Sequence, residues 1–440
     1  MSKQDTVYGY LPPDVPKVGA LVSLGFQHVL TMFPATVLVA ILTGFDVGVT
    51  LFASGLATVV ALLGSGMRIP LYYGSSFSYI AAVVAVVGAE WGGQQVAQVG
   101  IVATSFVSII AGLVIRWVGK EALDKALPPI ITGSVALVIG IALAKTALDM
   151  ASANWGVAII TLLATILFSV YLRGRGLIGM LPVLLGAVVG YIVSYIVGIM
   201  EFAPVAEAAW FRVPNFSFPA FTNPNAWRAV FAIAPIAIAT IPESTAHLYQ
   251  ISLYVDRLAE DLGRSPLNIK RLIGLNLILD GVGDLINGLL GGCAGTNYGE
   301  NNSLMAITRN YSAPVLVAAG VIAMALGFIG KLAALIGTLP TAVTGGLAIY
   351  LFGVIGLQGV ALIQSEKVDL FDPRQLAVGA VITVIGIGGA AFPGGNIPVG
   401  SFQLPSIATS AVVGILLNAI FLLFPPRSQP VAPGKETSPL

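Results

Sequence analysis

Charged residues are scarce in this chain. Asp, Glu, Lys and Arg make up 9% of its 440 residues and apolar residues 57%, whereas an ordinary soluble domain has about 25% charged residues. A globule of this size could not cover its surface with so few charges and stay in solution. The net charge of +1 leaves no basic surface for a nucleic acid. The composition therefore excludes a cytosolic enzyme, a nucleic-acid-binding protein and a disordered scaffold, and predicts a protein of the lipid bilayer.

Cysteine and histidine are almost absent as well. The single cysteine, Cys293, excludes an internal disulfide, a cysteine-based zinc site and an iron–sulfur cluster. The chain has only two histidines, His28 and His247, and we find no metal-ligand cluster or catalytic constellation in the sequence. We therefore expect no metal, no cofactor and no enzymatic activity, with an intramembrane enzyme as the rival hypothesis.

Long apolar runs fill most of the chain. A membrane helix needs about 20 apolar residues and, with a connector, roughly 30, so this length allows about 14 spans. We place them at 18–42, 46–66, 71–88, 94–116, 126–146, 154–172, 177–200, 227–252, 269–292, 298–308, 313–332, 336–363, 375–392 and 403–425. The polar segments 201–226 and 253–271 are expected to be loops. Residues 1–17 are expected to form a tail that is no signal peptide, and residues 426–440 a disordered tail.

Basic residues gather on one side when the loops between these spans alternate. With the N-terminus inside, every Lys and Arg lies on the inner side except Lys145, Arg212, Arg228 and Lys331. Basic loops mark the cytoplasmic side of a membrane protein. We therefore expect a multi-pass protein of the cell membrane with an even number of spans and both termini in the cytoplasm.

Two of the runs are poor membrane helices. Residues 71–80 begin with a stretch rich in Gly and Ser, and residues 295–303 contain almost no hydrocarbon. Each lies at the third position of one half of the chain, and two successive seven-span halves would have opposite orientations. Paired broken segments of this kind indicate an inverted-repeat transporter and mark its binding site. The alternative is that one or both are ordinary loops outside the membrane.

Charged residues inside apolar spans are costly and are functional candidates. Glu243 and His247 are four residues apart in one run, so they share a helix face. Histidine titrates near neutrality, and such a pair can pass a proton. The alternative is a structural pair that tethers two helices. Glu300 lies in the second broken segment, where it either faces the same cavity or is a loop carboxylate.

Other side chains at membrane depth could support such a site. His28 could be functional or could simply hold two helices together. Asp280 lies about mid-span and could help to polarise the site, whereas the position of Asp284 is more typical of a structural role. Phe77 and Tyr298 could stack on a planar ligand or only pack against neighbouring helices.

The groups near the broken segments limit the chemistry of the ligand. Two carboxylates facing one cavity repel anions, which argues against an anion transporter or channel, and they suit a cation or a ligand with N–H donors. Backbone N–H groups at free helix ends suit carbonyl oxygens. A small planar heterocycle such as uracil or xanthine satisfies both requirements, and an amine is an alternative that chemistry alone leaves open.

These residues occur in short motifs that follow one another in a fixed order. The motifs are Gln27-His28, Ala35-Thr-Val-Leu-Val, Gly74-Ser-Ser-Phe77, Glu243-x-x-x-His247, Tyr298-Gly-Glu-Asn301, Met305-Ala-Ile-Thr-Arg309, Gly330-Lys331-Leu-Ala-Ala, Phe352-Gly-Val-Ile-Gly and Glu366-x-x-Asp369. From about Val18 to the end of the last span, the chain resembles the nucleobase–ascorbate transporter family, and within it the bacterial uracil and uracil–xanthine permeases.

The resemblance implies an all-α fold of about fourteen spans in two inverted seven-span repeats, with short β-strands in the broken third and tenth spans. It implies a core domain at 18–118 and 227–333, a gate domain at 119–200 and 334–425, and an extracytoplasmic loop at 201–226. It also implies proton-driven import in which gate and core move against each other, and a homodimer.

The resemblance also assigns roles to particular residues. Carboxylates matching Glu243 and Glu300 accept hydrogen bonds from the substrate ring, and backbone amides matching Phe77 and Gly299 donate to its carbonyls, with Tyr298 beside them. The histidine matching His247 takes part in proton coupling near Glu243. The supporting positions are His28, Ala35, Ser76, Asn301, Asp280 and Phe352.

A few positions depart from the family pattern. Ser303 replaces a glycine of the family signature, Phe352 replaces a tyrosine of the uracil permeases, and Pro34 replaces a glycine near the site. Asp280 matches an aspartate more typical of purine transporters. We therefore expect a nucleobase importer that is coupled to a proton and uses no cofactor, with uracil as its substrate. Xanthine or uric acid are the alternative substrates, and an anion transporter or channel of the same fold is a more distant alternative.

Overall fold

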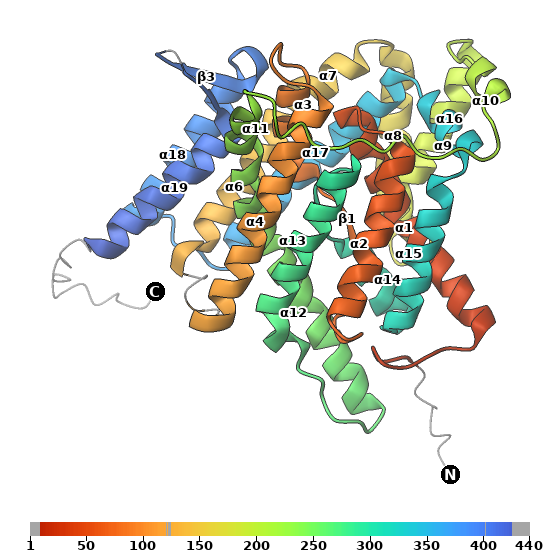
Figure 1. The fold of residues 1–440 in the computed structure, drawn as a ribbon, viewed down its shortest axis with the longest axis horizontal. Coiled ribbons are helices and arrows are strands. Elements are labelled where there is room, and N and C mark those ends of the chain that lie inside the picture. Colours follow the sequence, from red (N-terminus) through yellow and green to blue (C-terminus); the bar gives the residue numbers. More distant parts are fainter. Residues whose placement is uncertain (1–8, 120, 122–124, 401, 425–440) are drawn as a thin grey trace, which may run out of the picture.

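The apolar runs form helices that cross the molecule side by side (Figure 1). The structure, a computed structural model, describes residues 9–119, 121, 125–400 and 402–424. Residues 1–8 of the predicted N-terminal tail and the whole of the predicted tail at 426–440 lie outside the described residues. The predicted all-helical fold with two short strands in the broken segments is confirmed.

The first half of the chain runs from the first helix to the polar segment near residue 200. Its elements are α1 (Val18–Thr43), α2 (Val47–Gly64), β1 (Tyr73–Ser75), the 3₁₀ turn η1 (Phe77–Tyr79), α3 (Ile80–Val87), α4 (Gln94–Val118), α6 (Pro129–Ala142), α7 (Ala144–Ala151), α8 (Trp155–Tyr171), η2 (Ile178–Met180), α9 (Pro182–Val197) and α10 (Ala203–Glu207).

The second half repeats the order of a broken segment between long helices. Its elements are α11 (Ala226–Ile233), η3 (Ala234–Ile236), α12 (Ala237–Asp261), η4 (Ile269–Leu272), α13 (Ile273–Leu290), β2 (Gly295–Asn297), α14 (Gly299–Thr308), α15 (Ala313–Gly327), α16 (Gly330–Gly337), α17 (Thr341–Ser365), α18 (Pro373–Thr383), the π-helical turn η5 (Val384–Gly388), η6 (Pro393–Gly395), β3 (Asn396–Val399), β4 (Phe402–Pro405) and α19 (Ser406–Leu423).

The described helices account for the predicted spans. Eight helical segments are long and apolar enough to cross a bilayer, and five shorter apolar helices lie between them. The remaining predicted span, 298–308, corresponds to α14, which follows β2 and is too short and polar to cross unaided. Because lipid cannot satisfy free backbone groups, such a segment needs protein around it; β2 is buried throughout, and α14 packs against α1 and α12.

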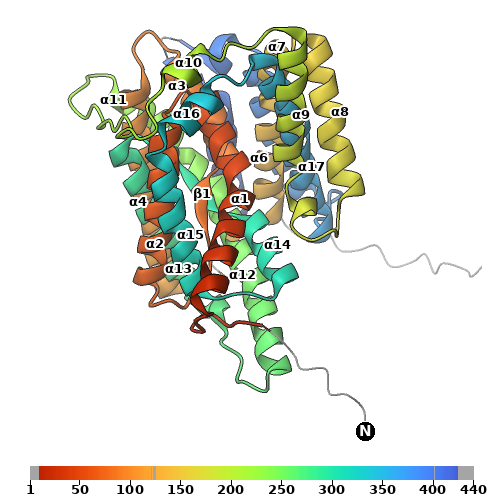
Figure 2. The ribbon, with the colours of Figure 1, turned by 90° about the vertical axis from the view of Figure 1, so that its right-hand side faces the viewer.

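The helices pack in two groups, which Figure 2 shows on opposite sides of the molecule. In one group α13 lies against α2 and α4, and α15 lies against α1 and α2. In the other α17 lies against α6, α7 and α8, and α18 lies against α6 and α19. Assigning these groups to a core and a gate that move against each other stays a prediction.

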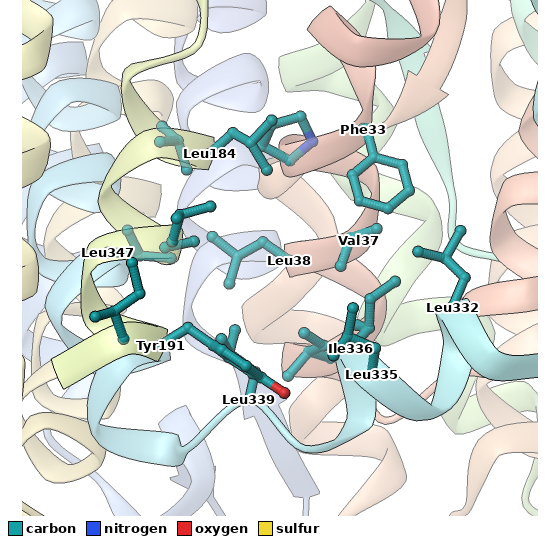
Figure 3. Close-up of a pocket in the computed structure, with 16 residues that line it drawn as sticks. Phe33, Val37, Leu38, Leu184, Tyr191, Leu332, Leu335, Ile336, Leu339 and Leu347 are labelled. Carbon is teal, nitrogen blue, oxygen red and sulfur yellow. The ribbon is translucent and has the colours of Figure 1, made fainter. Parts of the chain in front are cut away.

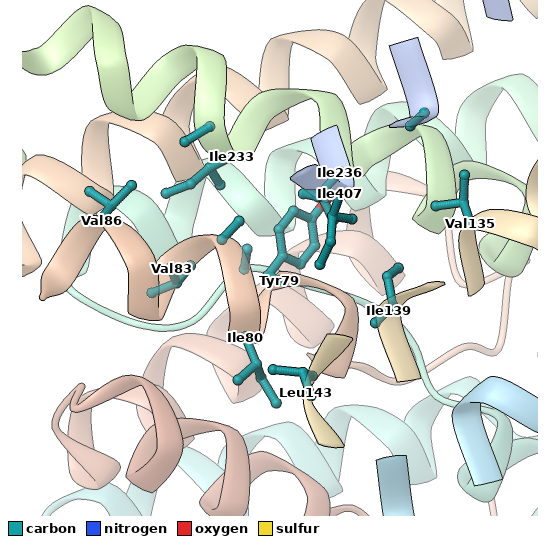
Figure 4. Close-up of a cluster of buried hydrophobic side chains, with 14 of the residues drawn as sticks. Tyr79, Ile80, Val83, Val86, Val135, Ile139, Leu143, Ile233, Ile236 and Ile407 are labelled. Carbon is teal, nitrogen blue, oxygen red and sulfur yellow. The ribbon is translucent and has the colours of Figure 1, made fainter. Parts of the chain in front are cut away.

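A large apolar cluster joins elements from both groups (Figure 4). Tyr79 and Ile80 of the first broken segment, and Val83 of α3, lie near Ile139 of α6 and Ile233 of α11, and all of these side chains are buried. Packed apolar side chains of this kind stabilise the arrangement without using a polar group. The cluster covers one side of the first broken segment.

Two features differ from the sequence-based expectation. The polar segment 253–271 is not all loop, because α12 continues to Asp261 before it ends. Its charged residues therefore form a helix end that extends past the apolar part of the span. Strands β3 and β4 form an antiparallel hairpin before α19 that the apolar run did not predict.

Candidate functional site

The two broken segments meet as a pair of antiparallel strands. Tyr73 lies opposite Asn297, Gly74 opposite Thr296 and Ser75 opposite Gly295. All six residues are buried. Each strand satisfies the backbone groups of the other, which is how irregular backbone can exist at this depth. The opposite directions of the strands agree with the inverted repeat.

A tyrosine fixes the register of these strands. The ring of Tyr298 lies directly over Gly74, where an added Cβ would be only 2.3 Å from the ring. The Tyr298 hydroxyl donates to the carbonyl oxygen of Ser75 at 2.8 Å and lies 2.9 Å from the Thr36 hydroxyl of α1. The side chain thus has a packing role, and its predicted contact with substrate stays a prediction.

Each strand leads directly into a helix that begins near the centre of the molecule. Ser76 caps η1, since its hydroxyl accepts a hydrogen bond from the N–H of Ser78. The other helix, α14, begins at Gly299, and no side chain caps it. The first N–H groups of a helix have no intrahelical acceptor and carry a partial positive charge. The predicted donor positions, Phe77 and Gly299, are therefore both at helix starts.

Helix α12 places its ionisable residues against the start of α14. The Nδ1–H of His247 donates to the backbone carbonyl of Asn297 at 2.7 Å. Its Nε2 lies 2.8 Å from the position that a Cβ on Gly299 would occupy. Only glycine allows the ring to approach this closely. Helix α12 therefore places His247 in contact with the second broken segment.

The two predicted carboxylates lie near each other in this region. Glu243 has no hydrogen-bond partner among the described residues, and it experiences the negative charges of Glu300 and Asp280. Glu300 lies in the first turn of α14. Both side chains are accessible to solvent although protein surrounds them. A ligand that reaches these two carboxylates from the solvent can therefore donate hydrogen bonds to them.

A buried polar network supports the strand side of the site. The Asn297 amide donates to the Ser244 hydroxyl at 2.8 Å, to the Asn276 carbonyl oxygen at 3.2 Å and to the Asp280 carboxylate at 3.3 Å. Asp280 therefore reaches the site through Asn297. None of Ser244, Asn276 and Asn297 was predicted from the sequence as a site residue. Their signal was a polar side chain inside an apolar span or beside the broken segment.

Asp284 lies behind the strands. One oxygen of its carboxylate accepts from the Tyr73 hydroxyl at 2.7 Å and from the Gly295 N–H at 2.8 Å. Both donors belong to the strand pair, and a buried donor without an acceptor is costly. The carboxylate thus joins α13 to both strands, as expected of a structural residue.

The remaining supporting residues hold neighbouring elements in place. The Asn301 amide donates to Nδ1 of His28 at 3.0 Å and to the His28 carbonyl at 3.2 Å, which ties α14 to α1. Ala35 is buried on α1. Phe352 is 1% exposed and belongs to the large apolar cluster that also contains Tyr79 and Ile80. Ser303 donates to the carbonyl of Gly299 at 3.0 Å within α14.

An apolar cavity of about 250 Å³ lies between α1, α9, α16 and α17. Figure 3 shows Phe33 and Val37 facing Leu184, Tyr191 and Leu339 across it. Its lining contains no charged residue. The cavity borders both groups of helices but none of the predicted site residues lines it. Among the described residues, no cluster of three or more His, Cys, Asp or Glu could hold a metal ion.

Comparison with known proteins gives the family. Residues 19–395 match the model of the Permease family, the xanthine/uracil permeases. The chain belongs to this family. The chain is 40% identical to the uracil permease of Bacillus caldolyticus over 427 residues, which covers 94% of each chain. It is 34% identical to the uracil permease of Escherichia coli (strain K12) over 421 residues, 93% of this chain and 92% of that one. The predicted resemblance is confirmed, and this permease is a multi-pass membrane protein.

Solved structures show the same fold in more distant proteins. The transmembrane domain of the cyanobacterium bicarbonate transporter BicA has a TM-score of 0.59 at 15% identity and covers 92% of this chain and 98% of that chain. The murine Solute Carrier 26 family member A9 anion transporter has a TM-score of 0.63 at 12% identity and covers 93% of this chain and 69% of that chain. At this identity the likeness concerns the fold of the permease alone.

Proposed function

We propose that this permease imports a nucleobase, uracil in the first place, together with a proton. The observation that carries the proposal is the placement of two solvent-accessible carboxylates, Glu243 and Glu300, beside the start of α14. The two relatives described above, at 40% and 34% identity, are named uracil permeases, which supports a nucleobase as the substrate.

The chemistry of uracil complements these groups. Its ring N–H groups donate to the carboxylates of Glu243 and Glu300, and its carbonyl oxygens accept from backbone N–H groups at Phe77 and Gly299. Hydrogen bonds with a charged partner are stronger than neutral ones. A purine base such as xanthine or uric acid has the same kinds of donors and acceptors, and is the second candidate within the family.

The proton in this proposal binds at Glu243 and His247. A proton taken up there from the outer side lets the nucleobase bind between the carboxylates; the gate then closes, and the site opens inward. His247 is suited to this step because Nδ1 donates to Asn297, which leaves Nε2 as the ring nitrogen that can accept a proton. The proposal includes both termini in the cytoplasm, a homodimer and alternating access of the gate against the core.

An anion transporter is a rival because two solved relatives of the fold have titles naming bicarbonate or anion transport. Two carboxylates facing the substrate space disfavour an anion here, because like charges repel. Enzymatic turnover of a bound nucleobase is the other rival.

One experiment separates these functions. The purified full chain is reconstituted into proteoliposomes, and uptake of radiolabelled uracil, xanthine and bicarbonate is measured with and without an imposed pH gradient. We expect saturable uracil uptake that the gradient increases. Uptake of bicarbonate without either nucleobase, or chemical conversion of the uracil, would overturn the proposal.

A further inference from the structure

A groove with a strongly basic lining lies at one end of α4 and α13, which pack side by side (Figure 1). We refer to it as the basic groove. Its volume is about 950 Å³, and its twelve lining residues include Gly64, Arg68, Arg116, Gly119, Lys270 and Arg271. Four of these are cationic and none is acidic. The groove is separate from the apolar cavity and from the candidate site residues.

Close helix packing brings the four cations together. An added Cβ on Gly112 of α4 would lie 2.6 Å from the carbonyl oxygen of Gly274 of α13, so these helices cross almost in contact. Arg116 is one turn beyond Gly112, and its Cβ lies 3.1 Å from the Cβ position of Gly274. Lys270 and Arg271 form the last turn of η4, which leads into α13. The crossing therefore places Arg116 beside them.

Arg68 completes the lining from the end of α2. Its Nε donates to the carbonyl of Ser65 at 2.8 Å, which holds the side chain in the turn after the helix. The guanidinium of Arg68 thus joins a group whose other members come from α4 and η4. Three parts of the chain contribute cations to one groove.

The charges in the groove lack acidic partners within the described part of the chain. None of Arg68, Arg116, Lys270 and Arg271 forms an ion pair there, and all four are exposed. Other arginines do have carboxylate partners: Arg212 with Asp46, Arg257 with Asp261, Arg264 with Asp14 and Arg309 with Asp261. Uncompensated cations that line one concave surface attract an anion.

Exposed apolar side chains next to the groove indicate that this anion is the headgroup of a lipid. Leu63 is 60% exposed, Trp117 88% and Val118 65%. These residues adjoin Gly64, Arg116 and Gly119 in the sequence. Exposed apolar side chains of a membrane helix contact lipid, and tryptophan favours the level of the headgroups. A headgroup in the groove would have its acyl chains against these side chains.

We propose that the basic groove binds the phosphodiester headgroup of an anionic phospholipid. Its arginines donate to the phosphate oxygens, as guanidinium groups do in other phosphate sites. Basic pockets between membrane helices are suited to this role. Tyr249 of α12 also lines the groove, so the bound lipid contacts the helix that contains Glu243 and His247.

Native mass spectrometry of the purified full chain tests the proposal directly. The titrated ligands are phosphatidylglycerol, phosphatidylcholine and soluble glycerol phosphate. We expect phosphatidylglycerol to bind more tightly than either of the others. The variant R116Q/R271Q should weaken its binding about 30-fold, because each basic side chain contributes roughly a fivefold factor. The charge-conserving variant R116K/R271K should retain most of the binding.

The matched control is R173Q/R175Q, which removes two exposed arginines from the segment between α8 and α9. It should bind phosphatidylglycerol like the unmodified chain. Equal binding of phosphatidylcholine, or unchanged binding by R116Q/R271Q, would overturn the proposal. If glycerol phosphate binds tightly and R116Q/R271Q abolishes that binding, the ligand of the groove is a soluble phosphate compound and the lipid proposal is overturned. If R116Q/R271Q does not elute and melt like the unmodified chain, R271Q alone is measured, with about a fivefold loss expected.

Discussion

The Nδ1–H of His247 donates a 2.7 Å hydrogen bond to the backbone carbonyl of Asn297, the last residue of β2. A carbonyl oxygen can only accept, so this bond fixes which ring nitrogen carries the proton. The other nitrogen, Nε2, faces Gly299 at the start of α14. The histidine that we propose for proton coupling is therefore oriented by the same strand that leads to Glu300.

Replacing His247 by asparagine tests its role in coupling. The asparagine amide can keep a donor near the carbonyl of Asn297 but cannot titrate. We expect H247N to exchange uracil across the membrane and to lose accumulation driven by a pH gradient. Counterflow and gradient-driven uptake in proteoliposomes measure the two activities. Full gradient-driven accumulation by H247N would contradict the coupling role, and H247A, which also loses the donor, is the comparison.

Removing the charge of Glu243 tests the second member of this pair. Glutamine has nearly the same shape but cannot release a proton. We expect E243Q to abolish uracil uptake driven by a pH gradient. E260Q is the matched control, because Glu260 is exposed near the end of the same helix. Accumulation by E243Q equal to that of E260Q would refute the role of Glu243.

Glu300 is proposed to accept a hydrogen bond from the substrate ring. A hydrogen bond to a charged group contributes about 1.5–3 kcal/mol, so E300Q should weaken uracil binding by roughly tenfold or more. Equilibrium binding of radiolabelled uracil to the purified protein measures this change. E207Q, in the exposed helix α10, should bind like the unmodified chain. Unaltered affinity of E300Q would remove Glu300 from the binding site.

The contact between Gly74 and Tyr298 should make the strand pair sensitive to one added methyl group. The Cβ of an alanine at position 74 would lie 2.3 Å from the ring, and overpacking of this kind costs about 1–3 kcal/mol. We expect G74A to lower the Tm measured in detergent. G353A adds the same methyl group on α17, where nothing lies within 4 Å, and should leave the Tm unchanged or higher. Equal Tm values for G74A and G353A would contradict this prediction, because β1 and Tyr298 would then separate at little cost.

The carboxylate of Asp284 should stabilise the strand pair. D284A leaves the Tyr73 hydroxyl and the Gly295 N–H without their acceptor, and each buried unsatisfied donor costs about 1–3 kcal/mol. Y73F removes only one of these donors. We therefore expect the Tm to fall more for D284A than for Y73F, while uracil binding by the folded fraction stays unchanged. A Tm of D284A equal to that of Y73F would contradict this account.

Much of the fold could be predicted because its pattern is local. The sequence shows directly how long each apolar run is and where the runs are interrupted by polar residues, at 71–80 and 295–303. In the structure the first interruption contains β1 and η1, and the second contains β2 and the start of α14. The end of α12 at Asp261 was missed because a charged sequence can remain helical once it leaves the bilayer. The β3–β4 hairpin was missed because its short strands adjoin an apolar run.

The amino-acid sequence was sufficient to place this chain in the membrane, to locate its two broken segments and to single out Glu243, His247 and Glu300. These conclusions depend on composition and spacing along one helix. Only the tertiary structure showed that Asn297 joins His247 to Asp280 and that Tyr298 covers Gly74. Such partners lie tens to hundreds of residues apart, and packing geometry decides which of them meet. The same holds for the basic groove, whose cations come together because Gly112 and Gly274 let two helices cross in contact.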